Sequence, residues 1–361
     1  MSQHPYREYP DFAFWRRAVV QPHYQEVDPV VQAPFGLVHT DCVVTAGSCF
    51  AQHIARYLKR SGFNYYVTET AHPLLCEEVG RTYNYGTFSA RYGNLYTPRQ
   101  LLQLFKRAYG TFSPKDDIWH TGDYFIDPYR PQIQPNGFSS IKEYNLDRKQ
   151  HFAAVRKAFE TMDVFIFTLG LTECWMSKED GAVYPLCPGV SGGEFDPDRH
   201  EFKNFRVDEV TEDMIEFVKL LRGINPRARI ILTVSPVPLM ATAEAKHVLV
   251  STTYSKSVLR VAAEQIVSLC ENTAYFPSYE IIMGIYNRGR YFAEDLRTVT
   301  EEGILHVMRL FMRHYAGTAE DQPSTSNEEV AISQQSAAHM QEMERLNLVV
   351  CEEEALGGCF E

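Results

Sequence analysis

Residues 47–49, Gly-Ser-Cys, stand where a short apolar run ends and a helical pattern begins. The apolar run, residues 42–46, is typical of a β-strand, and apolar residues then recur at helical spacing from Phe50 to Leu58. A thiol at such a turn lies at a helix N-terminus, where backbone N–H groups and the helix dipole favour negative charge. Cys49 is therefore a candidate nucleophile for acyl transfer. The alternative is a tight-turn glycine followed by a cysteine that packs in the core.

The elements around this turn alternate between strand and helix. Three more apolar runs, residues 164–169, 229–234 and 274–276, are typical of strands buried on both faces, and helical patterns separate them. This alternation predicts an α/β fold, a three-layer α/β/α sandwich around a doubly wound parallel sheet, with loop excursions.

Ligands of such sheets bind at the carboxyl ends of the strands, so the residues that follow each run are candidates for a site. They are Gly170, Thr172 and Glu173 after the second run, the loop that carries His247 after the third, and the loop with Asn84 and Gly86 between the first two. Glu173 is either an acid/base group or a cap of its own loop. Lys256, in the first turn of a helix expected from about Tyr254, either binds a substrate anion or is solvated.

Three histidines are candidates for a general base. His247 ranks first because its loop belongs to the expected active edge. His53 follows Cys49 by four residues on the same helix face, and His306 lies on the last helix. A lone histidine is more often a structural or surface residue than a catalytic one, and that alternative holds for each of them.

Charge and composition divide the chain of 361 residues into three regions. Residues 1–40 are rich in proline, tyrosine and tryptophan and predict an irregular arm. Residues 41–316 predict the α/β domain. Residues 317–361 hold ten acidic residues and one arginine, which accounts for most of the net charge of −11 and predicts a largely disordered acidic tail.

Several classes of protein are excluded by what the sequence lacks. A basic face is absent, so nucleic acid is not an expected partner. No run of eighteen apolar residues and no signal-peptide pattern occurs, which predicts a cytoplasmic protein without membrane association. The eight cysteines show no metal-ligand spacing, and no cofactor fingerprint is present, so we expect neither a metal nor a cofactor. A third hypothesis is redox sensing by a disulfide pair of Cys42 and Cys49.

Five segments resemble the GSCFA family, which looks like a branch of the SGNH/GDSL hydrolase superfamily. They are Gly47-Ser48-Cys49-Phe50-Ala51, Gly170-Leu171-Thr172-Glu173, Ser235-Pro236-Val237-Pro238, Tyr254-Ser255-Lys256-Ser257 and Phe276-Pro277-Ser278-Tyr279-Glu280. The resemblance runs from about Pro5 to Tyr315.

The resemblance implies roles for several of these residues. It places Cys49 on the nucleophile of the superfamily, with Ser48 as the alternative, and Gly86 on an oxyanion donor. Thr172 stands where the superfamily has an asparagine, and Asn84 is a candidate replacement for that amide. Losing one oxyanion donor typically lowers the rate roughly a hundredfold or more.

The last block of the superfamily, Asp-x-x-His, reads Asp295-Leu296-Arg297-Thr298 here. Because Thr298 replaces the histidine, the base must come from elsewhere, and His247 oriented by Asp295 is the expected pair. The expected function is that of an esterase or O-acyltransferase acting on a small or carbohydrate-linked acyl ester. The alternative is a catalytically degenerate relative that binds a glycan or a nucleotide-sugar.

Overall fold

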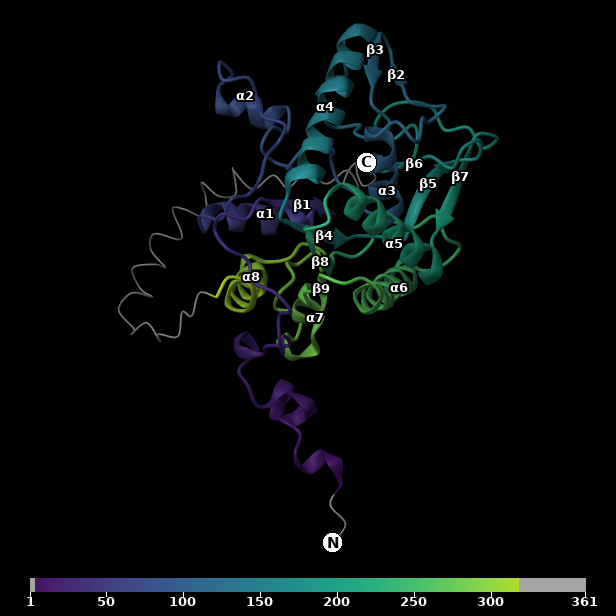
Figure 1. Ribbon diagram of the computed structural model, residues 1–361. Helices are drawn as coiled ribbons and strands as arrows, with labels where there is room; N and C mark the ends of the chain where they lie inside the picture. The colour runs from purple at the N-terminus through teal and green to yellow at the C-terminus, as the bar shows by residue number, and fades with distance from the viewer. Residues whose placement is uncertain (1–3, 318–361) are drawn as a thin grey trace.

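The computed structural model describes residues 4–317. Its core is a four-stranded parallel sheet of order β1-β4-β8-β9, formed by Val43–Gly47, Val164–Leu169, Arg229–Val234 and Thr273–Tyr275 (Figure 1). A parallel bridge between Val43 and Tyr65 extends the sheet beyond β1 by a single residue pair. The chain therefore crosses to one side of β1 and then to the other, which makes the end of β1 a switch point.

Helices cover both faces of this sheet. Alternate strand residues face opposite layers, as Phe165 and Phe167 do on one side and Val164 and Ile166 on the other. The first face packs against α3 (Pro98–Ala108), α4 (Ile141–Thr161), α5 (Val207–Ile224) and α6 (Val248–Leu269), and the second against α1 (Phe50–Arg60), α7 (Ser278–Met283) and α8 (Glu301–Tyr315). The predicted three-layer α/β/α sandwich is confirmed.

Two smaller sheets interrupt the alternation. A hairpin of β2 (Trp119–Thr121) and β3 (Tyr124–Ile126) lies beside α4 in Figure 1. The segment between β4 and α5 folds as an antiparallel sheet of order β6-β5-β7, from β5 (Glu173–Ser177), β6 (Val183–Tyr184) and β7 (His200–Asn204). The strand β5 begins four residues after β4 ends.

The segment before β1 consists of short turns. They are 3-10 turns at Pro5–Arg7, Asp11–Ala13 and Tyr24–Glu26, and a π turn at Arg16–Val20. Figure 1 shows this segment leaving the body of the molecule beneath α7. Two further short elements are α2 (Glu77–Thr82) and a 3-10 turn at Ile285–Asn287. The expected acidic tail lies outside the described residues, apart from Gly317.

Candidate active site

The Gly47–Ser48–Cys49 turn is held against the end of β4. Gly47 closes β1 with a φ of +134°, and a Cβ on it would lie 2.3 Å from the carbonyl oxygen of Thr168. Only glycine fits this position, because the conformation and the contact both exclude a side chain. The N–H of Ser48 donates to the same Thr168 oxygen at 3.1 Å. Cys49 then occupies the N-cap position of α1, without a capping bond from its side chain.

Gly170 brings the end of β4 onto the turn. A Cβ on Gly170 would lie 2.9 Å from the Cβ of Ser48. The N–H groups of Gly170 and Leu171 both donate to the carbonyl of Tyr96, at 2.9 and 3.0 Å, and the N–H of Leu95 donates to the carbonyl of Gly47 at 2.8 Å. The turn after β1, the residues that follow β4 and residues 95–96 therefore meet at this edge of the sheet. The structure shows the expected convergence of the turn with the residues after β4.

Ser48 and Cys49 are both nearly buried. Their exposed fractions are 3% and 7%. The hydroxyl oxygen of Ser48 has no hydrogen-bond partner among the described residues. Buried hydroxyls are usually satisfied, so this atom marks a place where a further hydrogen-bonding group is expected.

Asn94 is a candidate site residue that sequence reasoning missed. It is 1% exposed, and its Oδ1 accepts a hydrogen bond from Nε2 of Gln52 on α1 at 3.1 Å. Asn84 and Gly86, expected in this role, form no bond to the turn, and the amide of Asn84 donates to the carbonyl of Gln132 at 3.2 Å. The correction follows from the chain path between α2 and α3, since Leu95, near the start of α3, bonds to Gly47, whereas Asn84, near the end of α2, bonds to Gln132. A Gly-Asn pair just before a capped helix was the available signal.

Thr172 is fully buried, and its two donors are already used. Its N–H donates to Oγ of Ser255 at 3.0 Å, and its hydroxyl donates to Oδ1 of Asn204 at 2.7 Å. The expected oxyanion donor is thus a link between β4, α6 and β7 in this structure.

Lys256 reaches the site from α6. Its ammonium donates to the carbonyl of Gly170 at 2.7 Å, and the residue is 2% exposed. The sequence suggested a first-turn position, but α6 begins at Val248, so Lys256 lies deeper in the helix and packs under the end of β4. Ser255 and Lys256 together attach α6 to the residues that follow β4.

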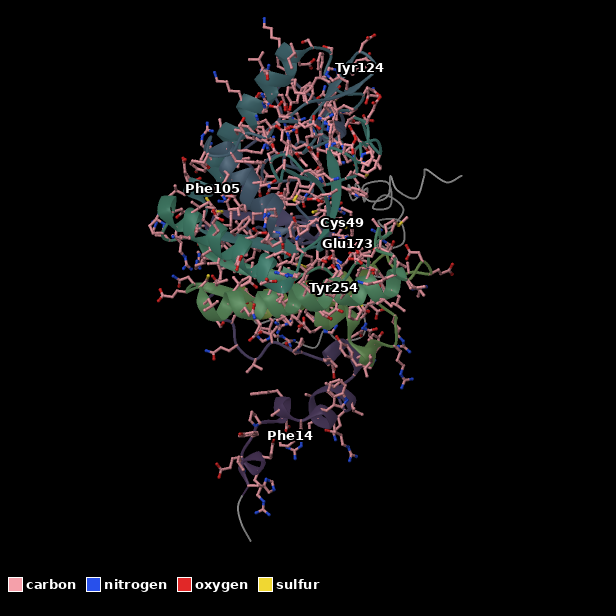
Figure 2. The ribbon with its side chains drawn as sticks, turned by 90° about the vertical axis from the view of Figure 1, so that its right-hand side faces the viewer. Phe14, Cys49, Phe105, Tyr124, Glu173 and Tyr254 are labelled. Atoms are coloured by element: carbon pink, nitrogen blue, oxygen red, sulfur yellow. The ribbon has the colours of Figure 1, made fainter. Side chains whose placement is uncertain are left out.

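Glu173 opens β5 on the same side of the molecule as Cys49, as Figure 2 shows. Its Oε1 accepts a hydrogen bond from the hydroxyl of Thr242 at 2.8 Å. Burial, with the nearby charge of Glu244, raises the pKa of Glu173 above its ordinary value. A carboxyl group with a raised pKa is suited to proton transfer.

The expected base and its orienting acid are not joined to the turn. His247 is exposed at the N-cap of α6, where its Nδ1 accepts from the N–H of Leu249 at 3.2 Å. Asp295 is also exposed, and its carboxylate accepts from the hydroxyl of Thr298 at 2.5 Å and from two backbone N–H groups of its own loop. In the part of the chain that the structure describes, the two side chains are not bonded to each other.

The two other histidines are poor bases at neutral pH. His53 packs against Phe50 on α1, and burial together with Arg56 lowers its pKa to about 3. His306 bonds through Nδ1 to the hydroxyl of Tyr291 at 2.7 Å, and burial lowers its pKa to about 4. Both rings are neutral at pH 7.

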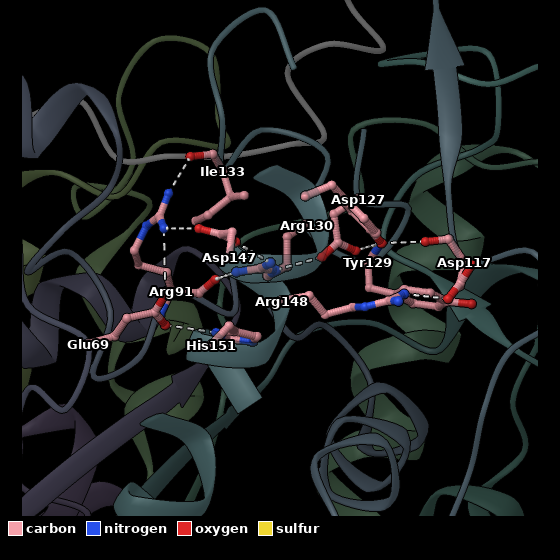
Figure 3. Close-up of polar contacts among 11 residues, drawn as sticks. Glu69, Arg91, Asp117, Asp127, Tyr129, Arg130, Ile133, Asp147, Arg148 and His151 are labelled. Atoms are coloured by element: carbon pink, nitrogen blue, oxygen red, sulfur yellow. Dashed lines mark hydrogen bonds and ion pairs between the residues drawn. The ribbon is translucent and has the colours of Figure 1, made fainter. Parts of the chain in front are cut away.

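A buried ionic network holds the segment that carries Asn94 (Figure 3). Arg91 is 1% exposed and pairs with Asp147 at 2.8 Å and with Glu69 at 3.5 Å. Glu69 also accepts from Nδ1 of His151 at 2.8 Å, and Arg130 pairs with Asp147 at 2.8 Å. Burial alone would raise the pKa of Glu69, but His151 and Arg130 lower it to about 2. The network joins α4 to the segment that crosses the turn.

Other sequence-based expectations can be checked within residues 4–317. No group of three or more metal-ligating side chains comes together there. No helix in that range has the length and apolar character to cross a membrane. Cys42 and Cys49 flank the five-residue strand β1. That strand spans roughly 16 Å, far beyond the ~7 Å Cα limit of a disulfide, so the redox pair is wrong.

Comparison with known proteins gives a family and a distant structural likeness. No curated protein matches this chain. One solved structure, a carbohydrate esterase family 2 enzyme plus carbohydrate binding domain from Corynascus thermopiles (Myceliophthora fergusii), shares 13% identity with a TM-score of 0.25, covering 78% of this chain and 69% of that one. The family model described as "GSCFA family" matches residues 42–311. The chain therefore belongs to the GSCFA family.

Proposed function

We propose that this chain is an SGNH-like acyl-transfer enzyme, an esterase or O-acyltransferase, whose catalytic unit is residues 41–316. The observation that carries the proposal is the pair of glycine contacts, Gly47 on Thr168 and Gly170 on Ser48, that hold the Ser48–Cys49 turn at the switch point. Ligands of doubly wound sheets bind at this point. The proposed substrate is a small or carbohydrate-linked acyl ester in the cytoplasm.

The reaction has two steps at Cys49. The sulfur attacks the ester carbonyl carbon, the carbon–oxygen bond to the alcohol breaks, and the alcohol leaves with a proton. Water or a second alcohol then attacks the thioester carbon, the carbon–sulfur bond breaks, and the acid or new ester leaves while the attacking group's proton returns to the sulfur. Backbone N–H groups at the start of α1 and the amide of Asn94 stabilise the oxyanion of both steps. Ser48 is the alternative nucleophile.

In this proposal, Glu173 accepts the proton of the Cys49 thiol and passes it to the leaving alcohol. Its raised pKa and its place beside the end of β4 favour it over His247, which is exposed and bonded to its own helix. Lys256 supplies a positive charge beneath Gly170, where it binds an anionic oxygen of the substrate. Because Cys49 is nearly buried, side chains around the turn must move before an ester reaches the sulfur.

A binding protein without catalysis is the second candidate. The observation that favours it is the bond between Asp295 and Thr298, since the acid of the expected catalytic pair is turned onto the residue that replaces the histidine. Such a protein would retain the pocket of an SGNH-like fold for a glycan or a nucleotide-sugar.

Intact-mass measurement with an activated acetyl ester, followed by peptide mapping, separates these candidates. The enzyme acquires one acetyl group on Cys49, and Cys49→Ala abolishes both the adduct and turnover. Cys76→Ala is the matched control because Cys76 is an exposed thiol outside the site. An acetyl group on Ser48 instead would identify Ser48 as the nucleophile. The absence of an adduct on either residue, with ligand binding retained, favours the binding protein.

A further inference from the structure

A cavity of about 510 Å³ lies away from the turn, between the N-terminal arm and the loop after α7. Its lining includes Trp15, His23 and Tyr24 from the arm and Tyr286, Arg288 and Arg290 from the loop. This volume falls within the range of about 300–1,000 Å³ that is usual for small-molecule sites.

Within residues 4–317, neither arginine has an acidic partner for its charge. Both are exposed, and within residues 4–317 neither guanidinium forms a hydrogen bond or an ion pair. No aspartate or glutamate is among the residues that line the cavity. Two guanidinium groups without a neighbouring carboxylate in one cavity favour an anion, and phosphate suits their planar array of donors.

The turn that carries these arginines is anchored. Arg288 and Gly289 both have positive φ values, of 54° and 78°. Asn287 stabilises this turn, because its Oδ1 accepts from the N–H of Gly289 at 2.8 Å and its Nδ2 donates to the carbonyl of Ile282 at 2.8 Å. Arg288 and Arg290 therefore project from a turn that is already formed.

The opposite wall presents aromatic rings. Trp15 is 63% exposed, and the guanidinium of Arg290 lies 4.8 Å from the centre of the Tyr24 ring. The hydroxyl of Tyr24 donates to Glu302 on α8 at 2.5 Å, and Gln25 donates to the same oxygen at 2.6 Å. These bonds tie the arm to the body where it forms the cavity wall.

We propose that this cavity binds an organic phosphate that carries a flat aromatic ring, of which a nucleotide is the ordinary example. Arg288 and Arg290 take the phosphate, and the ring stacks against Trp15 and its aromatic neighbours. The proposal uses a cavity distinct from the acyl-transfer site and does not depend on that activity.

Calorimetric titration of the full chain with AMP, adenosine and inorganic phosphate, at one ionic strength, tests the ligand class. AMP carries both the phosphate and the aromatic ring, so it binds at least tenfold more tightly than adenosine or inorganic phosphate alone. Trp15 lies in the cavity, so AMP also changes the tryptophan fluorescence, and Trp15→Phe removes that change. No saturable heat with AMP, or equal affinities for AMP and phosphate, overturns the proposal.

Variants test the place of binding. The double variant Arg288→Gln/Arg290→Gln weakens AMP at least tenfold, whereas Arg227→Gln, at an exposed arginine outside the cavity, leaves the affinity unchanged. Both arginines are exposed, so the double variant folds, and circular dichroism verifies this. Unchanged AMP affinity in the double variant overturns the proposal. A dimer by sedimentation that AMP does not dissociate also overturns it, since a second copy would then fill the cavity.

Discussion

Gly170 faces Ser48 with no room for a side chain between them, since a Cβ on Gly170 would lie 2.9 Å from the Cβ of Ser48 and 3.1 Å from the carbonyl oxygen of Tyr96. Two segments separated by more than a hundred residues thus meet at a glycine. The contact sets how closely the nucleophile turn approaches the end of β4.

Gly170→Ala should therefore displace the turn. We expect turnover of an activated ester to fall by roughly a hundredfold, because small displacements of reacting groups have such effects, while the free energy of unfolding falls by about 1–3 kcal/mol. Steady-state kinetics and urea unfolding measure the two quantities. Gly223→Ala is the control, since nothing lies within 4 Å of a Cβ there. Wild-type kinetics in Gly170→Ala would contradict the proposed site.

Arg91→Met should strongly destabilise the fold. It takes one buried partner from each of Glu69 and Asp147, leaving them with His151 and Arg130. Removing one member of a buried ion pair typically lowers the free energy of unfolding by about 3–5 kcal/mol. Arg81→Met breaks an exposed pair with Glu77 and should lower it by no more than about 0.5 kcal/mol. Urea unfolding of both variants gives the comparison. Equal losses of unfolding free energy would show that the buried network stabilises the fold no more than the exposed pair does.

His306 should make the protein less stable in acid. Burial lowers its pKa in the folded state to about 4, so the unfolded chain takes up this proton first as the pH falls. The stability that this residue contributes is complete above its unfolded pKa of about 6.5 and is lost towards pH 4, by on the order of 3 kcal/mol. His306→Gln should show a shallower decline of unfolding free energy over this range. A slope identical to that of the wild type would refute the assignment.

Glu173→Gln should change the pH dependence of turnover. As a base, Glu173 works only when ionised, so kcat/KM of the wild type falls as the pH drops through its raised pKa. The variant should lose this acid limb and about 10²–10⁴-fold in rate. Glu179→Gln, at an exposed glutamate, should keep the wild-type profile. An unchanged acid limb in Glu173→Gln would assign the titration to another group.

The sheet and the turn were predictable because their signals are local. Unbroken apolar runs indicated the four strands, and Gly47 indicated the sharp turn that follows β1. Asn94 was not predictable in this way, because its place depends on the path of a segment that crosses the turn without a regular element of its own. The depth of Lys256 was also missed, since polar residues before Tyr254 concealed the first turns of α6.

The strand β5 begins at Glu173, directly after the residues that link β4 to α6 and β7. The antiparallel sheet that follows is thus attached to the central sheet at the end of β4, while the central sheet carries the Ser48–Cys49 turn. Under the proposed function, this sheet can vary between family members without rebuilding the turn.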